Sequence, residues 1–253
     1  MALMDEFKEE REAIKNGPFK VRMAYFWDYY KWYVIGGACL VVFLVYTIFQ
    51  IATKKDIALN GIMLNISSME ASALMKEQGK LFADENEINL DKYALSFNTS
   101  MQYDEKNINA MGNMETLQAI MTWGAAGGID FMAGDVDALI DLAYKGYIED
   151  FREVWPKEQL APFEGKILYI DLAIIENREN AYLNNEQVEE LKIPDATKPE
   201  LMEKPVPVFV DVSDSSVMKE AYIGVKDRLV LGVAINAKNL DNIYAFLEYI
   251  LNE

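Results

Sequence analysis

The most informative residue for chemistry is the one that is missing, because the sequence contains no histidine. Ser-His and Cys-His nucleophile pairs, imidazole proton shuttles and the common zinc sites all require that side chain. Catalysis by carboxylates alone stays compatible with the composition, but the 35 Asp and Glu residues from 56 to 253 single out no acidic pair. The composition therefore predicts a protein that is not an enzyme and uses no metal or other cofactor.

One serine has the spacing of a nucleophile. Ser216 and Lys219 match the S-x-x-K pattern of penicillin-recognising enzymes, but the K-T-G and S-D-N motifs that accompany it are missing. A cap made by Asp214, Ser215 or Ser216 on the next helix explains the same residues more simply. Phosphate-binding glycine loops and EF-hand calcium loops are missing from the sequence as well. We therefore assign no catalytic and no metal-binding residue.

Three polar clusters are candidate ligand contacts, because each follows a segment with the pattern of a strand. They are Asn65, Ser67 and Ser68; Asn98, Thr99 and Ser100; and Ala133, Gly134 and Asp135. In α/β folds, ligands bind beyond the carboxyl ends of strands and close to helix N-termini. Each cluster also has a structural explanation, with Ser67 and Asp135 as helix caps and residues 98–100 as a turn. Both interpretations stay open at this point.

Strand-like and helix-like segments alternate from Asp56 onwards, which predicts an α/β layer architecture with a largely parallel sheet. Pro207 lacks a backbone N-H and therefore marks its strand as an edge strand. Residues 177–205 form a polar stretch that contains prolines. The predicted strands cover residues 56–66, 93–100, 129–134, 166–175, 206–212 and 228–236.

Helices are predicted between these strands from apolar spacing and caps. Ser67 and Glu70 form a capping-box pattern, the sequence GAAGG ends the second helix, and Asp135 and Gly146 fit the start and end of the third. Trp123 is expected in the core. The predicted apolar stripes are Leu74, Leu81 and Phe82; Met114, Leu117, Ile120 and Met121; Val136, Leu139, Ile140 and Ala143; and Leu240, Ile243, Tyr244, Leu247, Ile250 and Leu251.

A run of 22 uncharged residues, from 32 to 53, predicts one transmembrane helix. Such a helix is about 33 Å long, slightly more than the hydrocarbon core of a bilayer. Aromatic residues crowd its N-terminal edge from Tyr25 to Tyr33, and Lys54 and Lys55 follow it, as is typical of interfacial anchors. A cleaved signal peptide has a shorter apolar region and a small-residue cleavage site. We therefore expect an uncleaved signal-anchor.

The membrane prediction divides the chain into a cytoplasmic stub and interfacial helix (1–31), a transmembrane helix (32–53) and an extracytoplasmic domain (56–253). Within the stub, residues 4–18 have the pattern of a short charged helix stopped by Gly17 and Pro18. Three basic residues precede the span closely and two follow it, which favours a cytoplasmic N-terminus.

The body has a formal charge of −19, so it repels nucleic acid. The only cysteine, Cys39, lies in the span, so the body has no disulfide.

Two segments of the body resemble extracellular solute-binding proteins of ABC importers. They are QAIMTWGAAGGIDFMAGDVDALIDLAYKGYIEDFREV, residues 118–154, and GVAINAKNLDNIYAFLEYIL, residues 232–251. The layout that begins with YFWDYYKWYVIGG is also similar to single-pass membrane proteins of anaerobic Gram-positive bacteria. The resemblance implies a periplasmic-binding-protein-like mixed sheet with flanking helices. Because residues 151–228 are too few for the usual second lobe, we expect that lobe to be reduced.

These observations lead to one function hypothesis and two alternatives. We expect a non-enzymatic, membrane-anchored binding or accessory module that recognises a partner membrane protein, such as a transporter, or a small solute. The first alternative is a functional substrate receptor of an ABC importer. The second is a carboxylate-dependent hydrolase of cell-wall polymers. The expected location is the cell membrane, with the lipid bilayer as a partner through residues 32–53 and the body outside.

Overall fold

The computed structural model describes residues 18–66, 68–107, 111–184, 192–225 and 227–252. The chain divides into two units, Met1–Lys54 and Lys55–Glu253, of which the second is called the body below. The charged helix expected at residues 4–18 lies, apart from Pro18, outside the described residues, as does Ser67.

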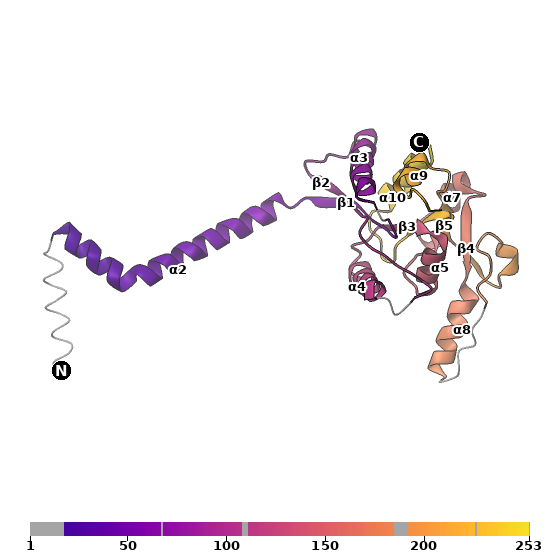
Figure 1. The fold of residues 1–253 in the computed structure, drawn as a ribbon, viewed down its shortest axis with the longest axis horizontal. Coiled ribbons are helices and arrows are strands. Elements are labelled where there is room, and N and C mark those ends of the chain that lie inside the picture. Colours follow the sequence, from indigo (N-terminus) through magenta and orange to yellow (C-terminus); the bar gives the residue numbers. More distant parts are fainter. Residues whose placement is uncertain (1–17, 67, 108–110, 185–191, 226, 253) are drawn as a thin grey trace. The chain divides into compact units, whose positions relative to one another are not determined.

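The first unit is dominated by one helix, α2, from Phe19 to Thr53, which follows Pro18 (Figure 1). Its segment Tyr30–Thr53 is 24 residues long, has a mean hydropathy of 2.3 and is long and apolar enough to cross a membrane. None of the side chains in the most apolar window of this segment is buried. A helix over the expected span is therefore confirmed, together with its continuation toward Phe19.

The body contains a six-stranded mixed sheet in the order β2-β1-β3-β6-β5-β4 (Figure 1). Strands β1, β2 and β3 are parallel to one another, whereas β3–β6, β6–β5 and β5–β4 pair antiparallel. The prediction of an α/β fold is confirmed at this level. The strands are β1 (Asp56–Met63), β2 (Tyr93–Asn98), β3 (Phe131–Asp135), β4 (Ile167–Asp171), β5 (Pro205–Asp211) and β6 (Leu229–Val233).

Helices cover both faces of the sheet, because the strands alternate apolar side chains between two buried layers. One layer joins the sheet to α3, α6, α9 and α10, and the other joins it to α4, α5 and α8. The helices of the body are α3 (Met69–Glu85), α4 (Met111–Ala125), α5 (Val136–Tyr144), α6 (Phe151–Val154), α7 (Lys157–Leu160), α8 (Leu172–Leu183), α9 (Ser216–Ala221) and α10 (Leu240–Asn252), with short 3-10 turns η1 (Ala161–Phe163) and η2 (Pro199–Leu201).

The expectation of a largely parallel sheet is wrong for the second half of the body. Strands β4, β5 and β6 are neighbours in the sheet and each reverses direction relative to the one before. The prediction that Pro207 marks an edge strand is also wrong, because β5 lies between β4 and β6. Pro207 is tolerated there because β5 pairs with β6 at Val210 and Asp211, so the missing N–H of Pro207 lies beyond the paired part of the two strands and interrupts no hydrogen bond between them.

The strand predicted over residues 166–175 is too long. It ends at Asp171, and α8 begins at Leu172. The Asp171 carboxylate caps this helix by accepting a hydrogen bond from Ala173 N at 3.1 Å. The apolar residues after Asp171 therefore belong to a helix, and part of the polar stretch predicted after residue 177 is helical too.

Several helix details follow the sequence, and some do not. Asp135 caps α5 and Gly146, with φ of 79°, follows its end as predicted. The cap of α3 is Ser68, whose hydroxyl accepts from Glu70 N at 3.0 Å. Leu81 and Trp123 are exposed rather than buried. Along α4 the buried positions include Asn113 and Thr116 in addition to Ile120, whereas Met114 and Met121 face outwards.

Candidate functional site

Asn65 and Asp135, which belong to two different predicted clusters, are brought together at the carboxyl ends of β1 and β3. Asn65 Nδ2 donates to Asp135 Oδ2 at 2.7 Å and to Tyr103 O at 2.8 Å. Asn65 Oδ1 accepts from Tyr103 N at 2.7 Å, and its backbone adopts φ of 63°. Asp135 Oδ1 accepts from Ala138 N at 3.0 Å. These bonds connect β1, the segment before α4 and the start of α5.

The other predicted contacts have local structural roles. Asn98 Oδ1 accepts from both the backbone N and the hydroxyl of Ser100, at 3.0 and 2.9 Å, which makes residues 98–100 a turn. Gly134 allows close approach, since an added Cβ would lie 3.2 Å from Leu64 Cβ. Ser68 caps α3. Ligand contact by Asn65, Ser68, Asn98, Thr99, Ser100, Gly134 and Asp135 stays a prediction.

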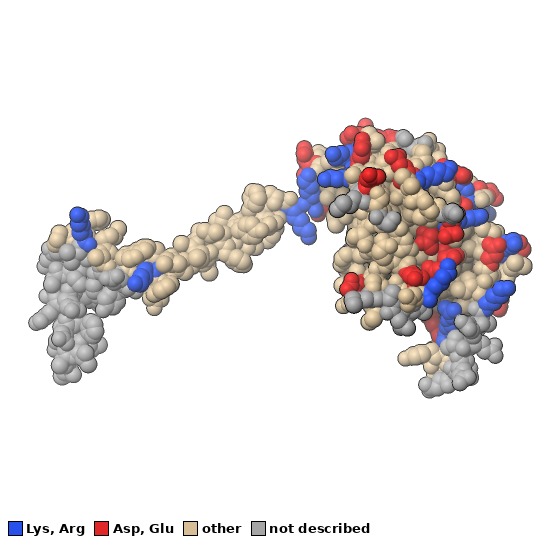
Figure 2. Space-filling view, viewed as in Figure 1, with Lys and Arg blue, Asp and Glu red and all other residues tan. Residues whose placement is uncertain are grey.

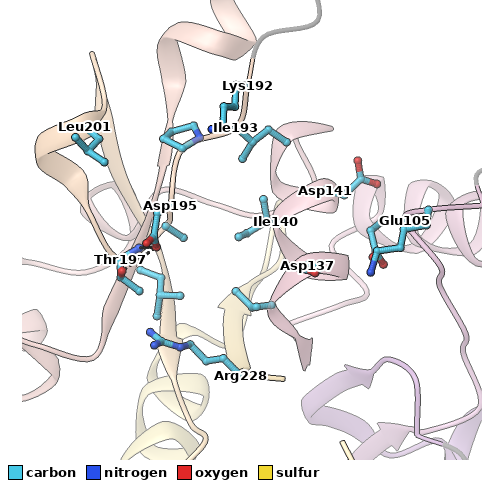
Figure 3. Close-up of a pocket in the computed structure, with 15 residues that line it drawn as sticks. Glu105, Asp137, Ile140, Asp141, Lys192, Ile193, Asp195, Thr197, Leu201 and Arg228 are labelled. Carbon is cyan, nitrogen blue, oxygen red and sulfur yellow. Dashed lines mark hydrogen bonds and ion pairs between the residues drawn. The ribbon is translucent and has the colours of Figure 1, made fainter. Parts of the chain in front are cut away.

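A cleft of about 1010 Å³ lies beside α5 (Figure 3). The sequence did not predict it. Its walls come from α5 on one side and from residues 192–197 and Leu201 on the other, and Arg228 lies at one end. We call it the α5 cleft. Its apolar lining is Val136, Ile140, Leu168, Ile193, Pro194, Ala196 and Leu201.

Most charged groups of the α5 cleft already have partners. Tyr103 Oη and Lys145 Nζ both donate to Asp141 Oδ2, and burial, together with this carboxylate, raises the pKa of Tyr103. Lys106 Nζ lies 3.2 Å from Glu105 Oε1, and Arg228 lies 3.4 Å from Asp211.

Asp195, on the opposite wall, is also engaged. Its carboxylate accepts hydrogen bonds from Thr197 N and Thr197 Oγ1, and Lys198 Nζ lies 3.3 Å away. The hydrogen bonds from Thr197, with the nearby ammonium, lower the pKa of Asp195 to about 2. Asp137 differs from these acids in being exposed; with Glu105, which acts more strongly, its charge raises the pKa of Lys106.

The lining of the α5 cleft suits the binding of a ligand. Among the described residues, no group of three or more Asp, Glu or Cys side chains is placed to hold a metal ion. An apolar lining between paired charges suits an apolar group, and the exposed carboxylate of Asp137 suits a basic or amide group beside it. A sequence signal existed in Ile193, Pro194 and Leu201, which are apolar residues within an otherwise polar stretch.

A second hollow, of about 560 Å³, lies where α6 and α7 meet strands β4 and β5. Trp155, Leu160, Ile167 and two prolines, Pro205 and Pro207, give it an apolar lining. The Trp155 ring packs edge-on against Tyr244, with centroids 5.7 Å apart. This hollow has fewer polar groups than the α5 cleft and therefore offers less specificity.

Comparison of the chain with protein-family models, with curated proteins and with solved structures gave no match.

Proposed function

We propose that this chain is a non-enzymatic binding or accessory module, tethered to the cell membrane by α2, with a cytoplasmic N-terminus and an extracytoplasmic body. Two features support the anchoring. The segment Tyr30–Thr53 is long and apolar enough to cross a bilayer, and aromatic residues and lysines flank it.

The body, on this proposal, receives a segment of a partner membrane protein in the α5 cleft. The observation that carries this part is the cleft itself, an open apolar trough whose flanking charges are largely paired with each other. Paired charges are poor nucleophiles and bases, but they fix the shape of a trough and the register of a bound chain. The bound segment is expected to place an apolar side chain against Ile140 and a basic one near Asp137.

A pair of photo-crosslinking variants tests the assignment of the cleft. The crosslinking amino acid p-benzoylphenylalanine replaces Leu201, which is 64% exposed within the cleft, or Leu81, which is 50% exposed on α3. Irradiation of intact cells should yield a discrete crosslinked protein from the Leu201 variant only. Adding Ile140→Lys should remove that product. Equal products from both positions, or none from Leu201, would refute docking in the cleft.

The topology is tested separately in a Cys39→Ala background, which removes the only cysteine. A Lys157→Cys variant places a thiol on the exposed surface of the body. A membrane-impermeant maleimide should label it in intact cells. Labelling only after lysis would place the body in the cytoplasm and end the proposed orientation.

A functional substrate receptor of an ABC importer is the second candidate. The volume of the α5 cleft, about 1010 Å³, favours it, since small-molecule pockets span about 300 to 1000 Å³. The resemblance of residues 118–154 and 232–251 to solute-binding proteins is in line with this alternative. A metabolite that binds the native state would raise the melting temperature of the protein. A screen of metabolites without any shift would count against it.

A cell-wall hydrolase gains no specific support. Asp137 and Asp141 lie one helical turn apart in the cleft, but Asp141 is held by Tyr103 and Lys145.

A further inference from the structure

The connection between α2 and the sheet is very short. Only Lys54 and Lys55 separate Thr53, the last residue of α2, from Asp56, the first residue of β1. An extended chain covers at most about 3.5 Å per residue, so the step from Thr53 to Asp56 spans about 10 Å at most. If α2 crosses the bilayer, chain length alone keeps the start of β1 close to the lipid headgroups.

The start of β1 is continuous with the start of β2 in the body. Asp56 pairs with Tyr93 in the parallel ladder, and Asp56 N donates to Lys92 O at 3.2 Å. Lys55 Nζ donates to Leu90 O at 2.5 Å. Residues 55–57 and 90–93 therefore form one surface, which we call the β1–β2 edge.

The side chains of this edge have the chemistry of a membrane interface. Ile57 is 48% exposed and Tyr93 is 43% exposed, and Lys55 and Lys92 are exposed beside them. Tyrosine and lysine are favoured at the headgroup level, because each combines an apolar stem or ring with a polar tip.

Charge distinguishes the β1–β2 edge from the rest of the body. Lys55 and Lys92 offset Asp56 and Asp91 there, whereas residues 56–253 carry a formal charge of −19. Figure 2 shows Lys and Arg side chains gathered near the start of β1 and many Asp and Glu side chains elsewhere on the visible face. An acidic surface is repelled by anionic headgroups within a Debye length, and a neutral edge is not.

We propose that the β1–β2 edge rests on the headgroup layer of an anionic bilayer. This inference rests on the proposed anchoring by α2. Strand β1 has eight residues, so its carboxyl end lies about 26 Å from its start. Contact confined to this edge leaves the carboxyl ends of β1–β3 and the start of α5 outside the contact, where a partner can reach the α5 cleft.

Fluorescence quenching in vesicles tests the contact with the full-length protein. In the Cys39→Ala background, an environment-sensitive fluorophore is attached to Tyr93→Cys or, as the matched control, to Ile223→Cys. Ile223 is 76% exposed and lies with Asn65 and Ser68 at the opposite end of β1. The vesicles contain phosphatidylglycerol, phosphatidylcholine and a lipid with a spin-labelled headgroup. We expect quenching of the Tyr93 probe and none of the Ile223 probe.

A charge variant adds a second measurement. Because the edge is neutral, a rising share of phosphatidylglycerol should leave quenching at Tyr93→Cys unchanged, whereas in the Lys92→Glu variant, whose edge is acidic, it should reduce quenching. Flotation of the same vesicles separates the two proposals. A protein that does not float with the vesicles refutes the anchoring and this inference together, whereas a protein that floats but is quenched equally at both positions refutes the β1–β2 edge alone.

Discussion

Asp130 is the buried acid whose removal should destabilise the body most clearly. It is 2% exposed and lies just before β3. Its Oδ2 accepts from Asn60 N at 2.7 Å, and its two oxygens share Asn239 Nδ2 at 3.0 and 3.1 Å, while Oδ1 also accepts from Asn239 N at 3.3 Å. This carboxylate thus joins β1 to the segment before α10, and Asp130→Ala removes the acceptor of these three donors.

The expected loss follows from the donors that remain. A hydrogen bond to a charged acceptor contributes about 1.5 to 3 kcal/mol, and a buried donor without a partner costs about 1 to 3 kcal/mol. Three donors that lose their charged acceptor give a loss of about 3 to 5 kcal/mol in the free energy of unfolding. The free energy of unfolding of a domain is about 5 to 15 kcal/mol. The variant should therefore still fold, but it should unfold at a lower urea concentration.

Urea unfolding of residues 55–253, followed by circular dichroism, measures this loss. Asp130→Asn keeps one acceptor oxygen and should fall between the wild type and Asp130→Ala. Asp227→Ala changes an exposed acid and should shift the free energy by less than about 0.5 kcal/mol. If Asp130→Ala unfolds at the same urea concentration as Asp227→Ala, the carboxylate does not connect these segments as described.

Two further predictions concern packing and pH. In Gly61→Ala the new Cβ would lie 2.1 Å from the Phe131 ring. Thermal unfolding should therefore show that the free energy of unfolding falls by about 1 to 3 kcal/mol. The control Gly112→Ala, whose Cβ meets open space, should show no such fall. Burial raises the pKa of Asp171, but hydrogen bonds from Glu203 N, Lys204 N and Ala173 N outweigh it and lower the pKa. The Asp171 carboxylate therefore stabilises the fold above about pH 4, and this stabilisation is lost as the pH falls through the pKa of Asp171 in the folded protein. The wild type should have a higher free energy of unfolding than Asp171→Asn at neutral pH, and urea unfolding at decreasing pH should show this difference becoming smaller.

Local patterns predicted those parts of the fold that depend on neighbouring residues. The apolar helix over residues 32–53, the cap at Asp135, the end of α5 at Gly146 and the apolar stripe of α10 all follow from spacing and capping within one segment. Two of the predicted ligand contacts, Asn65 and Asp135, meet in the structure. The hydrogen bond between them could not be foreseen, because 70 residues separate them in the chain.

Strand neighbours and directions were not predictable in the same way. The apolar residues after Asp171 are compatible with a strand or a helix. They form a helix because the Asp171 carboxylate caps it at Ala173 N and also accepts hydrogen bonds from Glu203 N and Lys204 N. Pro207 suggested an edge strand, but β5 lies between β4 and β6, and Pro207 is tolerated because β5 pairs with β6 further along, at Val210 and Asp211. Such outcomes depend on partners far away in sequence.

The sequence alone determined the apolar segment, the acidic body without histidine and the alternation of helices and strands. Each of these follows from residue type and local spacing, which need no distant partner. Tertiary structure alone decided the mixed strand order and the α5 cleft. The reason is physical, because a cleft exists only where α5 and residues 192–201, separated by some fifty residues of chain, are packed against the same sheet.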